Sequence, residues 1–265
     1  MSASHPHLPS SLALGALLSA LALLSIPSFG CDGVGVAAPR VMRLPIEPIQ
    51  QAPGLCGVAA GEMILTYYGV GEVGEGYVIS PESGGAALGQ ALCDLLAAGE
   101  GDQQQPRCVD GDKDAIPVYA AGKPTARTRE AYPDGTYLSN VAALLKGHGV
   151  QTEYRRSAYD KERQVYRPEA VAPGFTAMLT HLKAGHPAIF HVTPRLTRGG
   201  GHYLLAVGYD EGSRRLYYVD PNPAKGAGAL DSAPYDAVAG GQGFFRGSWF
   251  FTGRYLAVTD APRRP

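Results

Sequence analysis

Residues 49–69 read IQQAPGLCGVAAGEMILTYYG and place a cysteine between a proline-glycine turn and an apolar run. A helix is predicted over residues 57–68, because its apolar positions recur at helical spacing: Ala59, Ala60, Met63, Ile64 and Tyr67. Cys56 then lies at the N-terminal end of this helix, where backbone N–H groups lack intrahelical partners. The positive end of the helix dipole favours the thiolate form of a cysteine. We interpret Cys56 as a nucleophile.

The rest of the chain predicts helices first and strands last. Three further helices are expected from apolar residues at helical spacing, over residues 83–98, 137–146 and 174–184. Residues 99–135 are polar and rich in Gly and Pro, and predict an inserted surface loop. After Pro187 the pattern becomes extended, with a strand over residues 188–192 and a hairpin over residues 202–220. This order predicts one α+β domain, residues 46–260, in which N-terminal helices pack on a C-terminal antiparallel β-sheet.

Composition excludes several classes of protein. The 265 residues are 45% hydrophobic and 18% charged, with a formal net charge of −1. No basic stripe indicates a nucleic-acid partner, and no cofactor is expected. His181, His186 and His191 recur every five residues, but they span a helix end, a turn and a strand, so no metal site is predicted. The oligomeric state is not encoded in any recognisable pattern.

Residues 1–30 are expected to be an export signal. Leu12–Ile26 is uncharged and apolar, and it is shorter than the roughly 20 residues that span a membrane. Small residues precede Cys31 as in a bacterial lipoprotein signal, so Cys31 is predicted to be the lipidated first residue, followed by a spacer over residues 31–45. The protein would then associate with a membrane of the cell envelope. The alternative is simple secretion, with cleavage after Ala38.

Two cysteines remain for a disulfide in an exported protein. Cys93 and Cys108 bound the segment CDLLAAGEGDQQQPRC, and a bridge closing a loop of this length contributes roughly 3 kcal/mol. The alternative is two unpaired thiols.

The hairpin supplies a histidine and a carboxylate. If Asp210–Gly212 form a three-residue turn, Tyr209 faces Ser213 and His202 faces Asp220. Directly opposed residues share a sheet face, with Cβ atoms about 4.5–5.5 Å apart. We therefore predict a hydrogen bond that fixes the tautomer of the imidazole and stabilises its cation.

An amide donor is also expected beside the cysteine. Gln50 lies six residues before Cys56, across a Pro-Gly turn, where its side chain would donate to an oxyanion together with the Cys56 N–H. Gln51 is the second choice for this role. Asn222 is the second choice for the group that orients His202.

This ordered set of a glutamine, Cys-Gly at a helix start, a distant Gly-His and a following Asp-Pro resembles the papain-like cysteine peptidases. The phrases LLKGHGV, LKAGHPAIFHV and GGGHYLLAVGYD are similar to the subgroup of bacteriocin-processing, double-glycine peptidases, here stand-alone and exported. The likeness covers roughly residues 46–260. It implies a papain-like fold, a peptide or protein substrate, and a site in which Gln50 stabilises the oxyanion, Cys56 attacks, His202 is general base and acid, and Asp220 orients His202.

Other functions remain open on the same fold. A transpeptidase, amidase or deamidase uses the same acyl-thioester, and a non-catalytic peptide-binding envelope protein would have lost a triad member, which this chain has not. Double-glycine specificity is not implied, because the best-known members are attached to the transporter that exports their substrates.

Overall fold

The computed structural model describes residues 40–52, 54–74, 76–102, 119–120, 123–124, 136–156, 159–160, 165–194, 201–222 and 230–262. They all belong to one unit of the chain, Pro39–Pro265. The predicted signal (residues 1–30) and two of the predicted cysteine positions, Cys31 and Cys108, lie outside the described residues. So does most of the predicted loop at residues 99–135.

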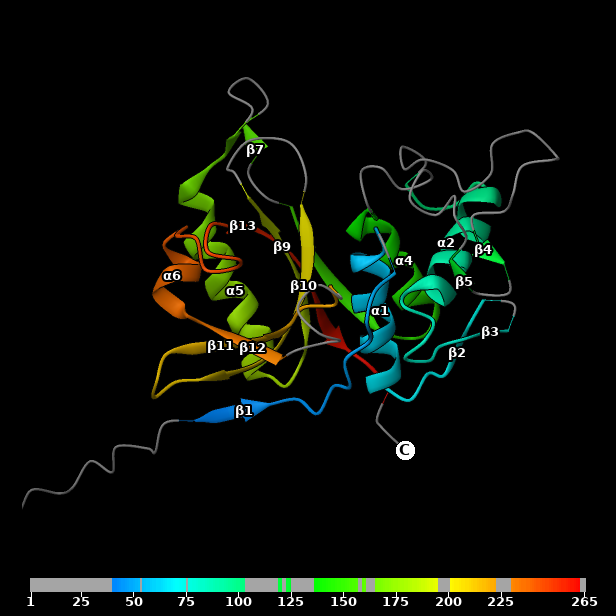
Figure 1. Cartoon of the computed structure of the whole chain (residues 1–265), viewed down its shortest axis with the longest axis horizontal. Helices are drawn as coiled ribbons and strands as arrows, with labels where there is room; N and C mark the ends of the chain where they lie inside the picture. Colours follow the sequence, from blue (N-terminus) through cyan, green and yellow to red (C-terminus); the bar gives the residue numbers. More distant parts are fainter. Residues whose placement is uncertain are drawn as a thin grey trace, which may run out of the picture. The chain divides into compact units, whose positions relative to one another are not determined.

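A seven-stranded antiparallel sheet is built mostly from the C-terminal half of the unit (Figure 1). Its order is β12–β11–β10–β9–β13–β6, and β1 pairs with the far end of β10. The strands are β1 Val41–Arg43, β6 Gln151–Arg155, β9 Ala188–Thr193, β10 His202–Asp210, β11 Arg215–Val219, β12 Leu230–Pro234 and β13 Phe250–Asp260. Residues 41–43, which the sequence analysis placed in the spacer, form β1 of this sheet.

Helices cover both faces of this sheet, as Figure 1 shows. On one face lie α1 Cys56–Tyr67, α2 Ala86–Ala97 and α4 Leu138–Gly147; on the other lie α5 Val171–Lys183 and α6 Tyr235–Ala239, with the short 3-10 helix η1 Pro168–Ala170 before α5. Alternate residues of β10 enter the two cores, Leu205 and Val207 the first, Leu204 and Ala206 the second. Strand β10 is therefore buried on both faces and reads as a continuous apolar run.

Three further strand pairs have two residues in each strand. They are β2 Glu72–Val73 with β3 Tyr77–Val78, β4 Tyr119–Ala120 with β5 Lys123–Pro124, and β7 Tyr159–Asp160 with β8 Val165–Tyr166. The pair β4–β5 lies within the segment that the sequence predicted to be a loop. Among the described residues, no helix is long and apolar enough to span a membrane.

The α+β prediction is confirmed, but the predicted hairpin register is wrong. The turn comprises residues 211–214, one residue more than predicted, and Asp210 therefore pairs with Arg215. The Asp210 carboxylate stabilises this turn by accepting hydrogen bonds from the backbone N–H groups of Gly212 (2.8 Å) and Ser213 (3.0 Å). Continued without interruption, this register would place His202 and Asp220 on opposite faces of the sheet.

A β-bulge corrects the register. It lies between Ala206 and Gly208, where β10 has one more residue than its partner, and beyond it Leu205 pairs with Val219. The shift by one residue returns His202, the first residue of β10, and Asp220, the residue after β11, to the same face of the sheet. The histidine and the carboxylate can then meet.

A buried carboxylate joins the cysteine-bearing helix α1 to the start of α2. Glu62 Oε2 accepts hydrogen bonds from Ser83 Oγ (2.5 Å) and the Gly85 N–H (2.9 Å), and Oε1 accepts the Leu88 N–H (2.9 Å). Burial raises the pKa of Glu62, although these hydrogen bonds lower it in part. Because Gly85 is left-handed (φ 94°), α2 begins at Ala86, three residues later than predicted.

We expect Glu62→Ala to lower the free energy of unfolding by roughly 2–4 kcal/mol, because two buried N–H groups at the start of α2 lose their acceptor. Urea denaturation followed by circular dichroism would measure it. The matched control is Glu72→Ala, on an exposed residue of β2, which should change stability by less than about 0.5 kcal/mol. Equal effects of the two variants would contradict the structural role of Glu62.

Candidate active site

Cys56 is the first residue of α1, and its side chain is almost fully buried. The N-cap residue Leu55 provides no side-chain cap, and the first intrahelical bond is donated by the Ala59 N–H. The N–H groups of the first turn, including that of Cys56, have no intrahelical acceptor. Cys56 is also a free cysteine. The free thiol and the unpaired N–H groups beside it are the arrangement that the sequence predicted, with a nucleophile next to a donor for the oxyanion.

The glycine after the cysteine permits the close approach of the strand that carries the histidine. A Cβ atom at Gly57 would lie 3.1 Å from the Tyr203 ring and 3.2 Å from the Thr136 side chain. Such contacts are tighter than ordinary van der Waals distances, so a larger residue would push β10 away from α1. The Cys-Gly pair thus lets His202, the neighbour of Tyr203, come close to Cys56.

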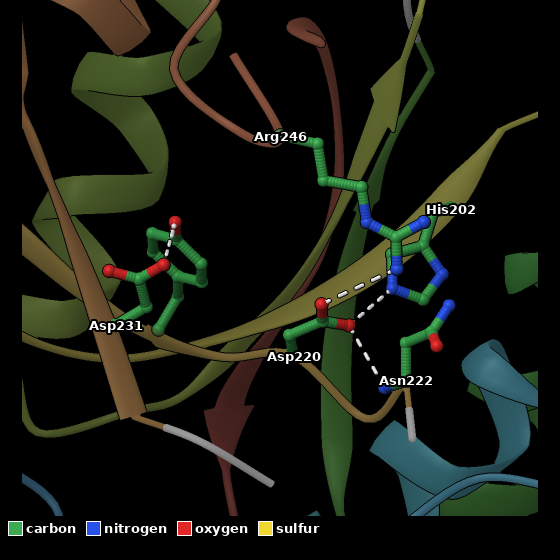
Figure 2. Close-up of polar contacts among 6 residues, drawn as sticks. His202, Asp220, Asn222, Asp231 and Arg246 are labelled. Carbon is green, nitrogen blue, oxygen red and sulfur yellow. Dashed lines mark hydrogen bonds and ion pairs between the residues drawn. The ribbon is translucent and has the colours of Figure 1, made fainter. Parts of the chain in front are cut away.

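His202 and Asp220 form a short hydrogen bond in the structure (Figure 2). Nε2 of His202 lies 2.6 Å from Oδ1 of Asp220, and the same oxygen accepts the Asn222 N–H at 2.9 Å. His202 also forms a hydrogen bond with the Cys56 thiol, for which Nδ1 is the ring nitrogen left. The structure therefore brings three sequence-predicted residues together in the order Cys56–His202–Asp220.

The electrostatics of the three groups favour a charged histidine. Burial alone would lower the pKa of His202, but the hydrogen bonds to Asp220 and Cys56 and the negative charges of both groups raise it to about 9. Burial alone would raise the pKa of Asp220, but the hydrogen bond and charge of His202 and the Asn222 N–H lower it. At neutral pH the pair is therefore imidazolium and carboxylate. A protonated imidazole therefore lies beside the Cys56 thiol.

The two neighbouring glutamines have different environments. The side chain of Gln50, the first choice from sequence, is exposed. Gln51 is buried; its N–H donates to the Pro221 carbonyl at 2.7 Å, and its side-chain Oε1 has no hydrogen-bond partner among the described residues. The next residue, Ala52, donates its N–H to the Gly84 carbonyl at 2.9 Å. Gln51 is thus held against the strand end that carries Asp220.

The segment before β13 adds groups that the sequence did not reveal. The Phe245 ring is stacked on His202, with centroids 5.7 Å apart and an interplanar angle of 20°, and Trp249 meets His202 edge-on at 6.4 Å. Nη2 of Arg246 lies 3.7 Å from the second oxygen of Asp220. Arg246 was missed because nothing in a local pattern of the sequence links it to Asp220.

The remaining cysteine and histidine predictions have mixed outcomes. Cys93 is disulfide-bonded, but its predicted partner Cys108 lies outside the described residues, so that pairing stays a prediction. Within the part of the chain that the structure describes, no group of three or more His, Cys, Asp or Glu residues is placed to hold a metal ion. Of the three regularly spaced histidines, His191 is buried and its ring contacts Thr252 Oγ1 at 3.1 Å.

A free cysteine at a helix start, beside a hydrogen-bonded histidine and carboxylate, is an arrangement suited to a thiol hydrolase. The family model described as Peptidase_C39 like family matches residues 43–255, and the chain belongs to that family. It is a cysteine peptidase, a hydrolase that acts on peptide or protein substrates, as the resemblance implied. The solved structures that match include xylellain, a cysteine protease from Xylella fastidiosa, at 16% identity and a TM-score of 0.35, over 84% of this chain and 87% of that one. No curated protein gives a significant match.

Proposed function

We propose that this protein is an exported cysteine peptidase that cleaves peptide bonds with a Cys56–His202–Asp220 triad. One observation carries the proposal: His202 is hydrogen-bonded on one side to a buried carboxylate and on the other to a free thiol at an uncapped helix N-terminus. This arrangement provides a thiolate and a proton donor on neighbouring atoms.

Each residue has a defined part in the proposed reaction. The Cys56 thiolate attacks the carbonyl carbon, and the tetrahedral intermediate collapses when the His202 imidazolium protonates the leaving amine. The neutral imidazole then takes a proton from water, which attacks the thioester and releases the carboxylic acid product. Asp220 holds the ring with Nδ1 towards the thiol and stabilises its cation. Phe245 and Trp249 shield the ring from water.

We propose Gln51, in place of Gln50, as the side chain that stabilises the oxyanion with the Cys56 N–H. Its support is its burial and the backbone hydrogen bond from its N–H to the Pro221 carbonyl, which holds it beside Asp220. The donor in this role would be the side-chain Nε2, because an amide oxygen only accepts hydrogen bonds. The six-residue spacing favoured Gln50, but that residue is exposed.

The adjacent glutamines provide a matched pair of variants. Gln51→Ala should lower kcat by about 10²- to 10³-fold, because one oxyanion donor is lost, whereas Gln50→Ala should stay within about threefold of wild type. Steady-state hydrolysis of a fluorogenic peptide would measure both. A larger loss in Gln50→Ala than in Gln51→Ala would reverse this assignment.

Hydrolysis itself is tested by digestion of a synthetic peptide mixture in water enriched in ¹⁸O. A peptidase places one ¹⁸O atom in each new C-terminal carboxyl group, and enzyme first alkylated with iodoacetamide is the control. Products joined to an amine acceptor, or glutamine residues converted to ¹⁸O-labelled glutamate without chain cleavage, would show transfer or deamidation and contradict the peptidase proposal.

We also propose that the chain is exported and anchored by lipid on Cys31. The support is the apolar stretch Leu12–Ile26 and the small residues before Cys31. In a bacterial host, wild type should partition into the Triton X-114 detergent phase and Cys31→Ser into the aqueous phase, because several acyl chains at one terminus anchor firmly. If both are aqueous and the mature N-terminus lies beyond Cys31, the protein is simply secreted.

A further inference from the structure

Asp220 uses its two carboxylate oxygens unequally. Oδ1 accepts two hydrogen bonds, from His202 and from the Asn222 N–H, whereas the buried Oδ2 accepts none within the described residues. Asp220 is only 2% exposed. The group that faces Oδ2 is the Arg246 guanidinium, whose Nη2 lies 3.7 Å away, as Figure 2 shows. The distance is that of an ion pair without a direct hydrogen bond.

Arg246 occupies a turn that does not suit it. Residues 245–248 form a β-turn closed by a hydrogen bond from the Ser248 N–H to the Phe245 carbonyl at 3.2 Å. Its two central residues, Arg246 and Gly247, both have positive φ, 49° and 76°. Such a turn favours Asn, Asp or Gly at both positions. An arginine there is strained, and a residue with a positive φ is a reason to look for a function.

The aromatic rings that contact His202 also support the arginine. The Arg246 guanidinium lies 4.9 Å from the centroid of Phe245 and 5.5 Å from that of Trp249. Its side chain is 29% exposed, so the cation is partly shielded from solvent. One aromatic pair thus positions both the imidazole and the guanidinium against the same carboxylate.

We propose that Arg246 is a positioning residue for the active site, which holds the second oxygen of Asp220 and so keeps the carboxylate charged and aligned with His202. The inference rests on the proposed function for the role of Asp220. Arg246 does not touch the thiol or the scissile bond. It acts on catalysis through Asp220.

The charges around Asp220 give the expected pH dependence. His202 faces it from β10 with Cys56 of α1 behind, the Asn222 N–H comes from its own strand end, and Arg246 comes from the turn before β13. On the side of β12, Tyr218 donates to Asp231 at 3.1 Å. The positive charge of Arg246 is among the causes that hold the pKa of Asp220 low, after burial, which opposes it, and the contributions of His202 and Asn222. Loss of Arg246 should therefore let Asp220 take up a proton at a higher pH.

Alkylation of Cys56 by iodoacetamide tests this without a substrate. The pH dependence of its rate reports the thiolate–imidazolium pair, so a failure of the peptidase proposal leaves this test readable. In wild type the alkylation rate should fall as the pH is lowered. In Arg246→Asn the midpoint of this fall (the acid limb of the profile) should lie about half a pH unit higher, and the rate near that midpoint should be about threefold lower. Arg246→Lys, which keeps the charge, should recover most of the shift. Because Asn suits the turn, the thermal midpoint of Arg246→Asn should be unchanged or higher.

The chain offers a matched control. Arg214 is the other non-glycine residue with positive φ among the described residues (51°), and it also pairs with an aspartate, Asp236, at 2.7 Å. Arg214 lies on the β10–β11 turn and Asp236 in α6, and both side chains are exposed, so Arg214→Asn should leave the alkylation profile unchanged.

A double-mutant cycle decides whether Arg246 acts through Asp220. In an Asp220→Asn background, Arg246→Asn should cause no further shift of the acid limb. The same shift in both backgrounds would mean that Arg246 acts directly on the thiolate and would overturn the proposal. A wild-type profile in Arg246→Asn, or a loss equal at every pH and matched by a lower thermal midpoint, would overturn it as well.

Discussion

Cys56→Ala should lower kcat/KM for peptide hydrolysis by about 10⁴-fold or more, because no other group can form the acyl intermediate. Cys56 is a free cysteine and the residue at which the histidine pair and the open helix N-terminus meet. The thiol is small and nearly buried, so an alanine leaves the fold and its thermal midpoint little changed. A fluorogenic peptide assay on freshly purified protein measures the loss.

The interpretation of Cys56→Ala needs a control for contaminating proteases. Wild-type enzyme that has been alkylated at Cys56 should be as inactive as the variant, and both should keep the circular dichroism spectrum of the active enzyme. A residual rate within tenfold of wild type, in a preparation free of wild-type enzyme, would contradict the assignment of Cys56 as the nucleophile.

Asp220→Asn should lower kcat/KM by about 10²- to 10⁴-fold, the upper value being that of the corresponding change in a serine protease. An asparagine keeps the shape of the side chain but removes the charge that favours the imidazolium and fixes its tautomer. Asp220 is nearly fully buried and 2.6 Å from His202, so solvent does not replace that interaction.

The pH profile gives Asp220→Asn a second readout. A histidine with a raised pKa is protonated, and its ion pair with the thiolate is present, at pH values below that pKa. In wild type, kcat/KM should fall as the pH rises through about 9, because His202 then loses its proton; this fall is the basic limb of the profile. Without the Asp220 charge that limb should move to lower pH. The control is Asp236→Asn, on an exposed carboxylate, and a basic limb equal to wild type in Asp220→Asn would show that Asp220 does not set the pKa of His202.

The elements that carry the site were predictable where local patterns decide them. The helix that begins at Cys56 follows from apolar residues at helical spacing, as does α4, and β9 follows from the extended pattern after Pro187. The strand β1 was missed because three residues on the edge of a sheet have no periodicity of their own. Its place is decided by the long strand β10 against which it pairs.

Positions that depend on a single residue of register were not predictable. The His202–Asp220 contact was predicted with a turn one residue too short, and it exists because the bulge near Val207 restores the face. The choice between Gln50 and Gln51 likewise depends on the backbone of a turn, which sequence spacing does not define. Arg246 reaches Asp220 from a distant segment, and only the folded chain brings them together.

The most direct test of the triad is to identify the covalent intermediate. Enzyme mixed with a slowly hydrolysed peptide ester, quenched in acid within milliseconds and digested with pepsin, should give a peptide that contains Cys56 and carries the acyl group as a thioester. Asp220→Asn should accumulate the same adduct more slowly, and Cys56→Ala should give none. An acyl group on another residue, or steady turnover with no adduct at Cys56 and an undiminished rate in Cys56→Ala, would contradict the catalytic role of this cysteine.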